Sequence, residues 1–223
     1  MKAVIFDMDG VIIDSEPIHE EIERGLLEEL GGKFDREFHH SLVGTTDHSM
    51  WTTYKKKFHL EPSVEEMVRM KKERFIKKVH RAPLVRKVCD LISILYDHGY
   101  PLALASSNNR KAVDAVIENF NLHKYFKFSI SGEEVIHGKP HPEIFLTAAG
   151  KMGMDPDGCL VIEDAENGVL AAKAAGMKCI GFRNPNSGNQ DLSKADLIIE
   201  SFDGLNLDRM RALFLSPSHG REE

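Results

Sequence analysis

Six short runs of mostly apolar residues are spaced along the chain, and each has the length of a buried strand. They are KAVIFD (2–7), PLALAS (101–106), KFSIS (127–131), CLVIED (159–164), KCIGF (178–182) and DLIIE (196–200). Short, nearly continuous apolar runs are typical of strands that are covered on both faces. The pattern therefore predicts six strands, the first of which ends at a pair of aspartates.

Helical patterns fall between several of these runs. Apolar residues recur at helical spacing over 84–98, where Gly99 ends the pattern, and again over 109–120. The segments HPEIFLTAAGKM (141–152) and AENGVLAAKAAGM (165–177) are also predicted to be helices. Strands that alternate with helices form parallel sheets with helices on both faces. The fold class predicted for most of the chain is therefore α/β.

The segment from residue 16 to residue 79 breaks this alternation, because it contains no convincing strand. Its first helical pattern places the apolar residues on one stripe, and two more helical patterns follow at 48–59 and 63–79. The simplest interpretation is an all-helical insertion packed beside the sheet. The predicted division is a core formed by residues 1–15 and 80–223 and a helical cap formed by residues 16–79.

Length, charge and cysteine content limit the possible functions. A chain of 223 residues suits one α/β domain that carries an insertion, and a net charge of −6 argues against a broad nucleic-acid footprint. The three cysteines are far apart and odd in number, which does not suggest a disulfide framework. Because the sequence shows neither a long apolar run nor a signal sequence, we expect a soluble, cytoplasmic protein. No heptad or large apolar stripe on the helical segment demands a partner, so we expect a monomer. Its partner should be a small molecule and neither a nucleic acid nor a membrane.

Polar residues that follow the predicted strands form the candidate site. They are Asp7 and Asp9 after the first run, Ser106, Ser107 and Asn108 after the second, Glu163 and Asp164 after the fourth, and Lys139 before a helix. In an open parallel sheet, ligands bind beyond the carboxyl ends of the strands. We therefore expect these side chains to converge on one edge of the sheet.

The residue types gathered there suit phosphoryl transfer. Asp7, Asp9 and Asp164 offer the oxygen ligands that Mg²⁺ prefers. The serine hydroxyls and the N–H groups of a helix start can hold a phosphate, and Lys139 can neutralise a phosphoryl oxygen as a point charge. Such groups position the reactants and stabilise the charge of a metaphosphate-like transition state.

The two aspartates of the DMDG segment are assigned different roles. We expect alternation along the extended strand end to send their side chains to opposite sides, with Gly10 allowing the backbone to turn past a crowded site. Asp7 is assigned as the nucleophile that forms an aspartyl-phosphate. Asp9 is assigned as the general acid that protonates the leaving oxygen and then activates water. Asp9 should hold a proton part of the time, so we expect its pKa to be raised near the substrate-bound state.

The segment FDMDGVIIDSEP (6–17) resembles the first motif of the haloacid dehalogenase superfamily, in its β-phosphoglucomutase-like phosphatase branch. LALASSNN (102–109), HGKPHPEIF (137–145) and VIEDAENGVLAAKAAGM (161–177) resemble the second, third and fourth motifs, in the same order. The resemblance covers nearly the whole chain. It implies a Rossmannoid core, a helical cap inserted after the first strand, and Mg²⁺-dependent chemistry.

The same resemblance implies roles for individual residues. By position, the nucleophile falls on Asp7, the acid/base on Asp9, and the phosphate-binding residues on Ser106 and Lys139. The implied metal site consists of Asp7, the Asp9 carbonyl oxygen, Asp164 and the adjacent Glu163.

Substrate contacts are expected from His19, Gly44 and Thr45 in the cap and from Ser107 and Asn108 in the core. Sugar-phosphate mutases of this branch hold a second phosphate with a cap-loop arginine. The loop here reads SLVGTTDHSMW, and Asp47 stands in the place of that arginine. A carboxylate would repel a phosphate. The resemblance therefore favours a phosphatase that acts on a monophosphate, either a sugar phosphate or a nucleotide-like ester.

Four other functions remain open from the sequence. A phosphohexomutase would need the second phosphate site that Asp47 disrupts. A dehalogenase would use no metal, and a phosphonate hydrolase would need a Schiff-base lysine in the cap. A phosphate-sensing or partner-binding protein would bind metal and phosphate without turnover.

Some conspicuous residues have structural interpretations. Asp14, Ser15 and Glu16 are expected to cap the first helix of the insertion and to set the hinge. Trp51 is expected to pack inside the insertion. His137 and His141 straddle a glycine and a proline, so they cannot share a helix face. No zinc site is therefore expected.

Overall fold

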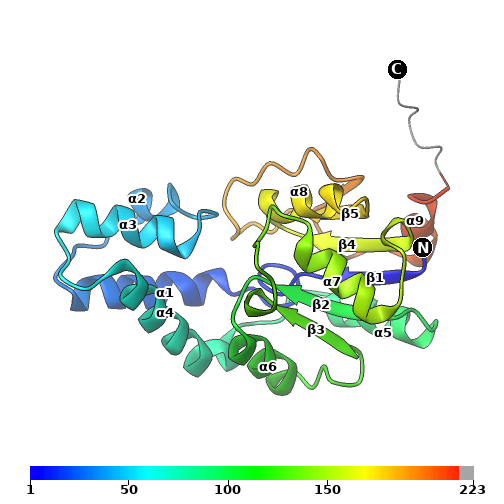
Figure 1. Cartoon of the computed structure of the whole chain (residues 1–223), viewed down its shortest axis with the longest axis horizontal. Coiled ribbons are helices and arrows are strands. Elements are labelled where there is room, and N and C mark those ends of the chain that lie inside the picture. The colour runs from blue at the N-terminus through cyan, green and yellow to red at the C-terminus, as the bar shows by residue number, and fades with distance from the viewer. Residues whose placement is uncertain (216–223) are drawn as a thin grey trace.

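A six-stranded sheet forms the centre of the molecule in the computed structural model, which describes residues 1–215 (Figure 1). The strands are β1 (Ala3–Phe6), β2 (Leu102–Ser106), β3 (Phe128–Ser131), β4 (Cys159–Glu163), β5 (Lys178–Phe182) and β6 (Leu197–Ile199). Neighbouring strands pair in parallel, in the order β3-β2-β1-β4-β5-β6. Each predicted run therefore contains a strand, and the α/β fold class is confirmed.

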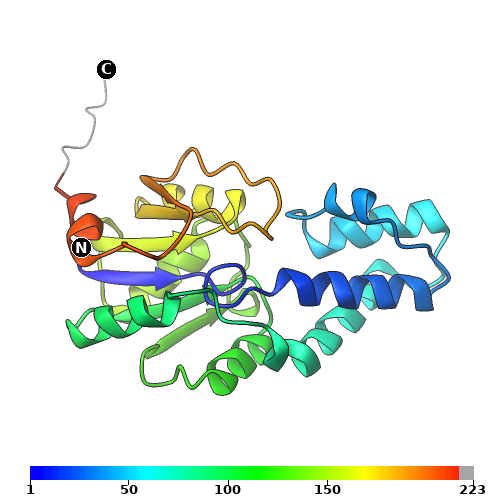
Figure 2. The ribbon, with the colours of Figure 1, turned by 180° about the vertical axis from the view of Figure 1, so that it is seen from behind.

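Helices cover both faces of this sheet, as two opposite views show (Figures 1 and 2). They are α5 (Val88–Asp97), α6 (Arg110–Asn119), α7 (Glu143–Met152), α8 (Glu166–Ala174) and α9 (Leu207–Ala212), with 3₁₀ turns at Val79–Arg81, Gly132–Glu134 and Pro156–Gly158. Val4 and Phe6 of β1 pack with residues of α5 and α6, whereas Ala3 and Ile5 pack with residues of α7 and α8. Because successive side chains of a strand face opposite sides, a sheet with two cores needs apolar residues at every position.

An all-helical insertion, here called the helical unit, lies between β1 and α5. It consists of α1 (Glu16–Glu29), α2 (Arg36–His40), α3 (Asp47–Phe58) and α4 (Val64–Lys78). Its apolar cluster includes Trp51, Tyr54 and Met67. Figure 1 shows the unit at the end of the sheet toward which the strand arrows point. Across residues 1–215, every helix is too short or too polar to span a bilayer.

The helical patterns at 48–59 and 63–79 are confirmed as α3 and α4, to within one residue at each end. The short helix α2 was not predicted. The division of the chain at residues 16–79 stays a prediction.

Two segments connect the helical unit to the sheet, and they are hydrogen-bonded to each other. The N–H of Asp14 donates to the carbonyl of Pro83 at 2.8 Å, and the N–H of Val85 donates to the carbonyl of Ile12 at 2.9 Å. Ile13 forms an antiparallel bridge with Leu84. The two connections therefore run side by side as a short pair of strands.

The register of the sheet brings the predicted site residues to one edge. Phe6 pairs with Leu104 on one side and with Ile162 on the other, so Asp7 and Glu163 lie level. The chain order reverses between β1 and β4, because β2 and β3 lie on one side of β1 and β5 and β6 lie beyond β4. Loops diverge at such a switch point and leave a crevice in which ligands bind.

Candidate active site

The loop after β1 separates the two aspartates. Gly10 has a φ of 74°, and a side chain at this position would collide with the carboxylate of Asp164. A regular strand would place Asp7 and Asp9, which are two residues apart, on the same face. The strand ends at Phe6, and the bend that follows gives the two carboxylates separate partners. The expected divergence is present, but it comes from the end of the strand and not from alternation along it.

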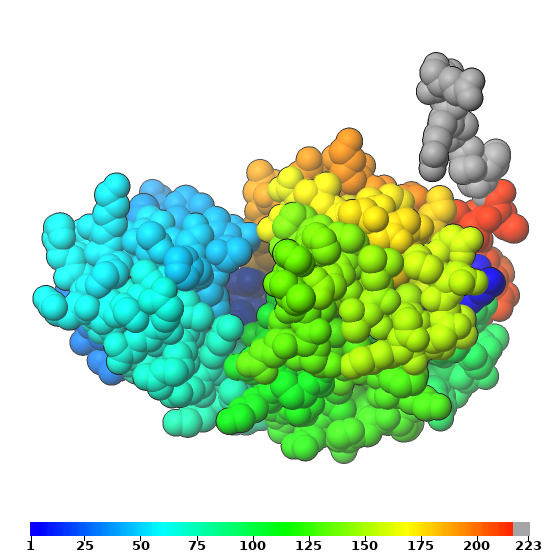
Figure 3. All heavy atoms as spheres, viewed as in Figure 1, coloured from blue at the N-terminus to red at the C-terminus, as the bar shows by residue number. Residues whose placement is uncertain are grey.

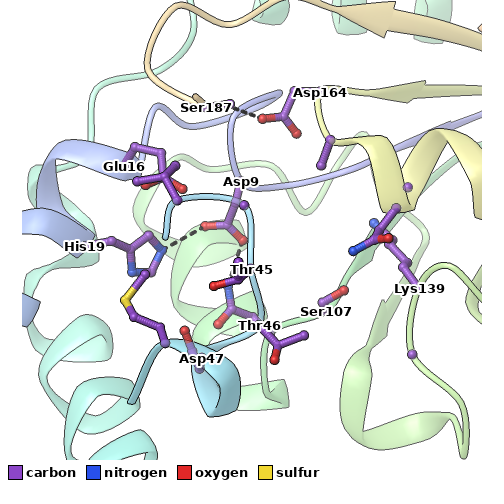
Figure 4. A pocket seen from close by; sticks show the side chains of 18 of the residues that line it. Asp9, Glu16, His19, Thr45, Thr46, Asp47, Ser107, Lys139, Asp164 and Ser187 are labelled. Atoms are coloured by element: carbon purple, nitrogen blue, oxygen red, sulfur yellow. Dashed lines mark hydrogen bonds and ion pairs between the residues drawn. The ribbon is translucent and has the colours of Figure 1, made fainter. Parts of the chain in front are cut away.

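A cavity of about 500 Å³ lies between the strand ends and the helical unit. Figure 3 shows the molecule hollowed between these two parts. Every predicted site residue except Ser106 lines this cavity: Asp7, Asp9, His19, Gly44, Thr45, Ser107, Asn108, Lys139, Glu163 and Asp164. In the close view, side chains from the β1 loop, from α1 and from the loop before α3 point into the same space (Figure 4).

Lys139 is held at the sheet edge by two carboxylates. Its ammonium donates to Asp7, to Glu163 Oε1 at 2.7 Å and to the carbonyl of Ala105 at 3.3 Å. Burial alone would lower the pKa of Lys139, but Asp7 and Glu163 outweigh burial and raise it. Lys139 therefore stays positively charged although its side chain is buried.

Glu163 positions Lys139. Its second oxygen accepts hydrogen bonds from the N–H groups of Asp164 and Ala165, both at 2.8 Å. A Cβ on Gly168 of α8 would overlap this carboxylate, so that glycine makes the space that Glu163 occupies. Both Glu163 oxygens thus already have partners.

A cluster of carboxylates at this edge fits a divalent cation. Asp7, Glu163 and Asp164 each offer an oxygen, and these atoms lie within 4.8 Å of one another. Burial raises the pKa of Asp7 and of Asp164, and the neighbouring carboxylates raise both further. Three carboxylates beside one ammonium leave an excess of negative charge. Hard oxygen donors with such an excess are the donor set that Mg²⁺ favours.

Asp9 has a different environment. Ser15 donates to its Oδ1 at 2.7 Å, Asn108 donates to its Oδ2 at 2.7 Å, and His19 Nε2 lies 3.6 Å from Oδ1. Burial alone would raise the pKa of Asp9, but His19, Ser15 and Asn108 lower it overall. The raised pKa that we expect near the substrate-bound state is therefore not present in this structure, because these donors favour the anion.

Ser15 and Glu16 lie at the start of α1, as expected, but both also have other contacts. The Ser15 side chain makes no capping hydrogen bond to α1, and its hydroxyl donates to Asp9 instead. Glu16 lines the cavity. Both residues therefore belong to the site, and sequence reasoning assigned them to the helix start and the hinge.

His19 is fixed between Asp9 and an aromatic ring. Its imidazole stacks on Phe75 of α4, with ring centroids 4.4 Å apart and planes at 14°. Burial and Lys71 would lower the pKa of His19, but Asp9 and Glu16 outweigh them and raise it. Its buried Nδ1 has no hydrogen-bond partner within residues 1–215. A protonated His19 is thus placed to share a proton with Asp9.

Ser106 at the end of β2 is 1% exposed and lies behind the cavity surface. Its hydroxyl accepts from the N–H of Asn108 at 3.1 Å and reaches Asp9 Oδ2 at 3.4 Å. Ser107 and Asn108 line the cavity in its place. The phosphate-binding role assigned to Ser106 stays a prediction.

The wall contributed by the helical unit contains an ion-pair group that the sequence did not reveal. Lys71 of α4 pairs with Glu23 Oε1 of α1 at 2.5 Å and with Asp47 Oδ1 at the start of α3. Asp47 is therefore paired with a lysine of another helix, which the loop sequence did not reveal. One signal was available: Glu16, His19 and Glu23 lie three and four residues apart and so share one face of α1.

Packing inside the helical unit agrees with one expectation, and a loop near Lys139 brings two histidines together without placing them on one helix face. Trp51 is fully buried in the apolar cluster, as expected. His137 and His141 do come together, with ring centroids 4.6 Å apart, and they form a group with Glu143. They meet across a loop and not on a helix face. Glu143 already accepts from the N–H of His137 at 3.0 Å, which ties this loop to the start of α7.

Comparisons with known proteins find relatives over most of the chain. A family model described as haloacid dehalogenase-like hydrolase matches residues 4–182. The chain is 33% identical over 190 residues to hexitol phosphatase B of Escherichia coli (strain K12), with 84% of this chain and 86% of the relative covered. It is 31% identical over 184 residues to the phosphorylated carbohydrates phosphatase of Thermotoga maritima, with 81% and 84% covered. The crystal structure of CbbY from Rhodobacter sphaeroides in complex with phosphate matches with a TM-score of 0.82 at 26% identity, over 92% of this chain and 96% of that one.

Proposed function

Because this chain belongs to the haloacid dehalogenase-like hydrolases, we propose that it is a Mg²⁺-dependent phosphatase of small phosphorylated metabolites. The observation that carries the proposal is the separation of two carboxylates at one strand end. Asp7 lies against Lys139 in the acidic cluster, and Asp9 lies apart from it among Ser15, Asn108 and His19. The names of the two relatives described above point to a phosphorylated sugar or polyol as the substrate.

In the proposed reaction, Asp7 attacks the phosphorus atom and forms an aspartyl-phosphate. Lys139, which Glu163 holds in place, neutralises a phosphoryl oxygen as negative charge shifts in the transition state. When Mg²⁺ is bound, with Asp7, Asp164 and the Asp9 carbonyl as its proposed ligands, it supplies additional positive charge at this edge.

The leaving oxygen takes its proton from the Asp9–His19 pair. Since the pKa of Asp9 is lowered and that of His19 is raised, the shared proton resides mainly on His19 before substrate arrives. Asp9 delivers that proton to the departing alkoxide and later removes one from the water that hydrolyses the aspartyl-phosphate.

The helical unit acts as a cap in this proposal. The cavity is bounded by the sheet edge on one side and by α1, α3 and α4 on the other. Substrate must enter before water is excluded, so we infer that the unit swings open and closed about the paired connections. Substrate choice would then depend on side chains such as His19 and Thr45.

Two alternatives are less well supported. A mutase needs a second phosphate site, and Asp47 carries a negative charge on the cavity wall. A phosphonate hydrolase needs a neutral, nucleophilic lysine in the cap. Lys71 lines the cavity, but Glu23 and Asp47 outweigh its burial and raise its pKa, so it stays protonated.

The test is phosphate release from a panel of sugar phosphates, polyol phosphates, nucleotides and p-nitrophenyl phosphate, with Mg²⁺ and with chelator. Release should require Mg²⁺ and should fall by about 10³-fold or more in Asp7→Asn. The matched control is Asp155→Asn, which removes an exposed carboxylate far from the cavity lining and should leave release unchanged. Release that survives both the chelator and Asp7→Asn would contradict the proposal.

A further inference from the structure

A chain of buried polar groups runs from the centre of the helical unit to the cavity. The hydroxyl of Tyr54 lies 3.0 Å from His39 Nδ1, and His39 Nε2 lies 3.5 Å from Glu23 Oε2. Glu23 Oε1 pairs with Lys71, which pairs in turn with Asp47. These residues come from α1, α2, α3 and α4, so the chain of contacts depends on all four helices.

The contacts fix the position and charge of Asp47. The side chain of Glu23 is 2% exposed and that of Lys71 is 8% exposed, whereas that of Asp47 is 31% exposed at the cavity wall. Both Glu23 oxygens have partners, and the Lys71 ammonium is shared between two carboxylates. Burial alone would raise the pKa of Asp47, but Lys71 outweighs burial and lowers it. Asp47 is therefore an anion whose position is fixed by its ion pair with Lys71.

One oxygen of Asp47 remains available. Lys71 contacts Oδ1, and within residues 1–215 no side chain donates to Oδ2. Figure 4 shows Asp47 in the same space as Thr45 and Thr46, across the cavity from Lys139. A carboxylate oxygen in this position accepts hydrogen bonds from hydroxyl groups and opposes a second anion.

We propose that Asp47 selects substrates whose far end carries neutral hydroxyl groups and rejects those whose far end carries a second anionic group. The substrate class is therefore a sugar or polyol monophosphate without a carboxylate or a second phosphate. This inference rests on the proposed phosphatase function and adds the specificity-determining residue. Glu23 and Lys71 are positioning residues, because they act through Asp47.

Lys72 is the neighbouring cation that could lead to the opposite preference. It also lines the cavity, and its charge contributes to lowering the pKa of Asp47. If Lys72 received the far end of the substrate, an anionic end would bind more tightly than a neutral one. The two possibilities therefore predict opposite signs in one comparison.

The experiment compares two ligands that differ only at the end remote from the phosphate. Glucitol 6-phosphate ends in a hydroxymethyl group, and 6-phosphogluconate ends in a carboxylate. Their dissociation constants are measured calorimetrically in the Asp7→Asn variant of the full chain, which should bind without turnover. We expect glucitol 6-phosphate to bind at least about tenfold more tightly.

Adding Asp47→Asn should bring the two dissociation constants to within about threefold of each other, because the repulsion is gone while an acceptor remains. The matched control adds Glu61→Gln, which removes an exposed carboxylate of the helical unit outside the cavity lining and should leave the preference intact. Thermal unfolding verifies that each variant is folded. If Asp47→Asn does not fold, Asp47→Ser replaces it, since serine is favoured at helix starts.

Equal binding, tighter binding of 6-phosphogluconate, binding of neither ligand, or a preference that survives the loss of Asp47 would each overturn the inference. Phosphate release by the wild-type chain is measured separately. A wild-type chain that releases no phosphate while Asp7→Asn keeps the Asp47-dependent preference would refute the phosphatase and leave the recognition intact.

Discussion

Two buried lysines border the cavity, and each bridges two carboxylates. Lys139 comes from the sheet side and lies between Asp7 and Glu163, whereas Lys71 comes from the helical unit and lies between Glu23 and Asp47. The local motif is the same in both places. Its electrostatic consequences are opposite.

The difference arises from what surrounds each pair. Asp164 adds a third carboxylate beside Lys139, so burial and neighbouring charge raise the pKa of Asp7. The pKa of Asp47, which lines the cavity, is lowered despite burial, because the charges of Lys71 and His19 favour its anion. An excess of buried negative charge marks a place where a cation and a phosphoryl group can be accommodated. The group on the helical unit has one carboxylate fewer beside its lysine, and it marks a surface of fixed charge that can recognise the rest of the substrate.

The largest effect is expected from Lys139→Met. Removing the ammonium leaves Asp7 and Glu163 without their shared partner. Phosphate release should fall by about 10³-fold, and the free energy of unfolding should fall by about 3 kcal/mol. Urea titration and a phosphate assay measure the two losses. Lys151→Met, which breaks a half-exposed pair with Glu134, is the control and should change stability by less than about 1 kcal/mol.

Lys71→Met should lower the free energy of unfolding by a similar amount, about 3 kcal/mol, because the buried carboxylate of Glu23 loses its ammonium partner and keeps His39. Its effect on the hydrolysis of p-nitrophenyl phosphate should be much smaller than that of Lys139→Met, since the aryl group has no hydroxyls for Asp47 to recognise. Lys72→Met, which replaces the adjacent lysine of α4, is the matched control for Lys71→Met. A 10³-fold loss of aryl phosphatase activity in Lys71→Met would erase the distinction between the two lysines.

A smaller effect is expected from His19→Asn, and it depends on pH. The pKa of His19 is raised in the folded chain, so its stabilising contribution is fully present below its ordinary value of 6.5 and is lost as pH rises through the folded value. The loss of unfolding free energy in His19→Asn should therefore be larger at pH 6 than at pH 9. Urea titration at both values, with exposed His123→Asn as control, measures this. An equal loss at both pH values would show that His19 and Asp9 do not share a proton.

The smallest effect concerns a carboxylate between two cations, which is the inverse of the two lysine sites. Burial alone would raise the pKa of Glu134, but Lys151, the N–H of Ser131 and Arg110 lower it to about 2. Its contribution is present above the ordinary value of 4.5 and is lost as pH falls toward 2. Glu134→Gln should cost less than about 1 kcal/mol at pH 7. That cost should vanish near pH 2, as thermal unfolding across the range would reveal.

Local patterns in the sequence predicted the sheet and its acidic edge well. Apolar runs identify buried strands directly, and a parallel sheet brings all strand ends that carry polar residues to the same side. Asp7, Asp164 and Lys139 were therefore predictable together, although Asp7 lies more than a hundred residues before the other two. The short helix α2 was missed, because five residues are too few to show a helical period.

The polar network of the helical unit was not predictable in the same way. Tyr54, His39, Glu23, Lys71 and Asp47 belong to four helices, and no contiguous motif contains them. Lys71 lies in a lysine-rich stretch that is typical of a solvated face. That side chain is buried only because α4 packs where Glu23 of α1 and Asp47 of α3 can pair with it. The site wall that we propose for specificity is therefore a property of tertiary packing.

The hydrogen-bonded connections at residues 12–14 and 83–85 restrict the geometry of any opening movement. A body attached by one strand can tumble in many directions, whereas a body attached by two paired strands keeps a single preferred axis. If the helical unit swings as proposed, Ser15 and His19 move with it because they lie just beyond this axis. Each opening would then strip Asp9 of two of its donors, and each closure would restore them. The acid strength of Asp9 would be reset mechanically in every catalytic cycle.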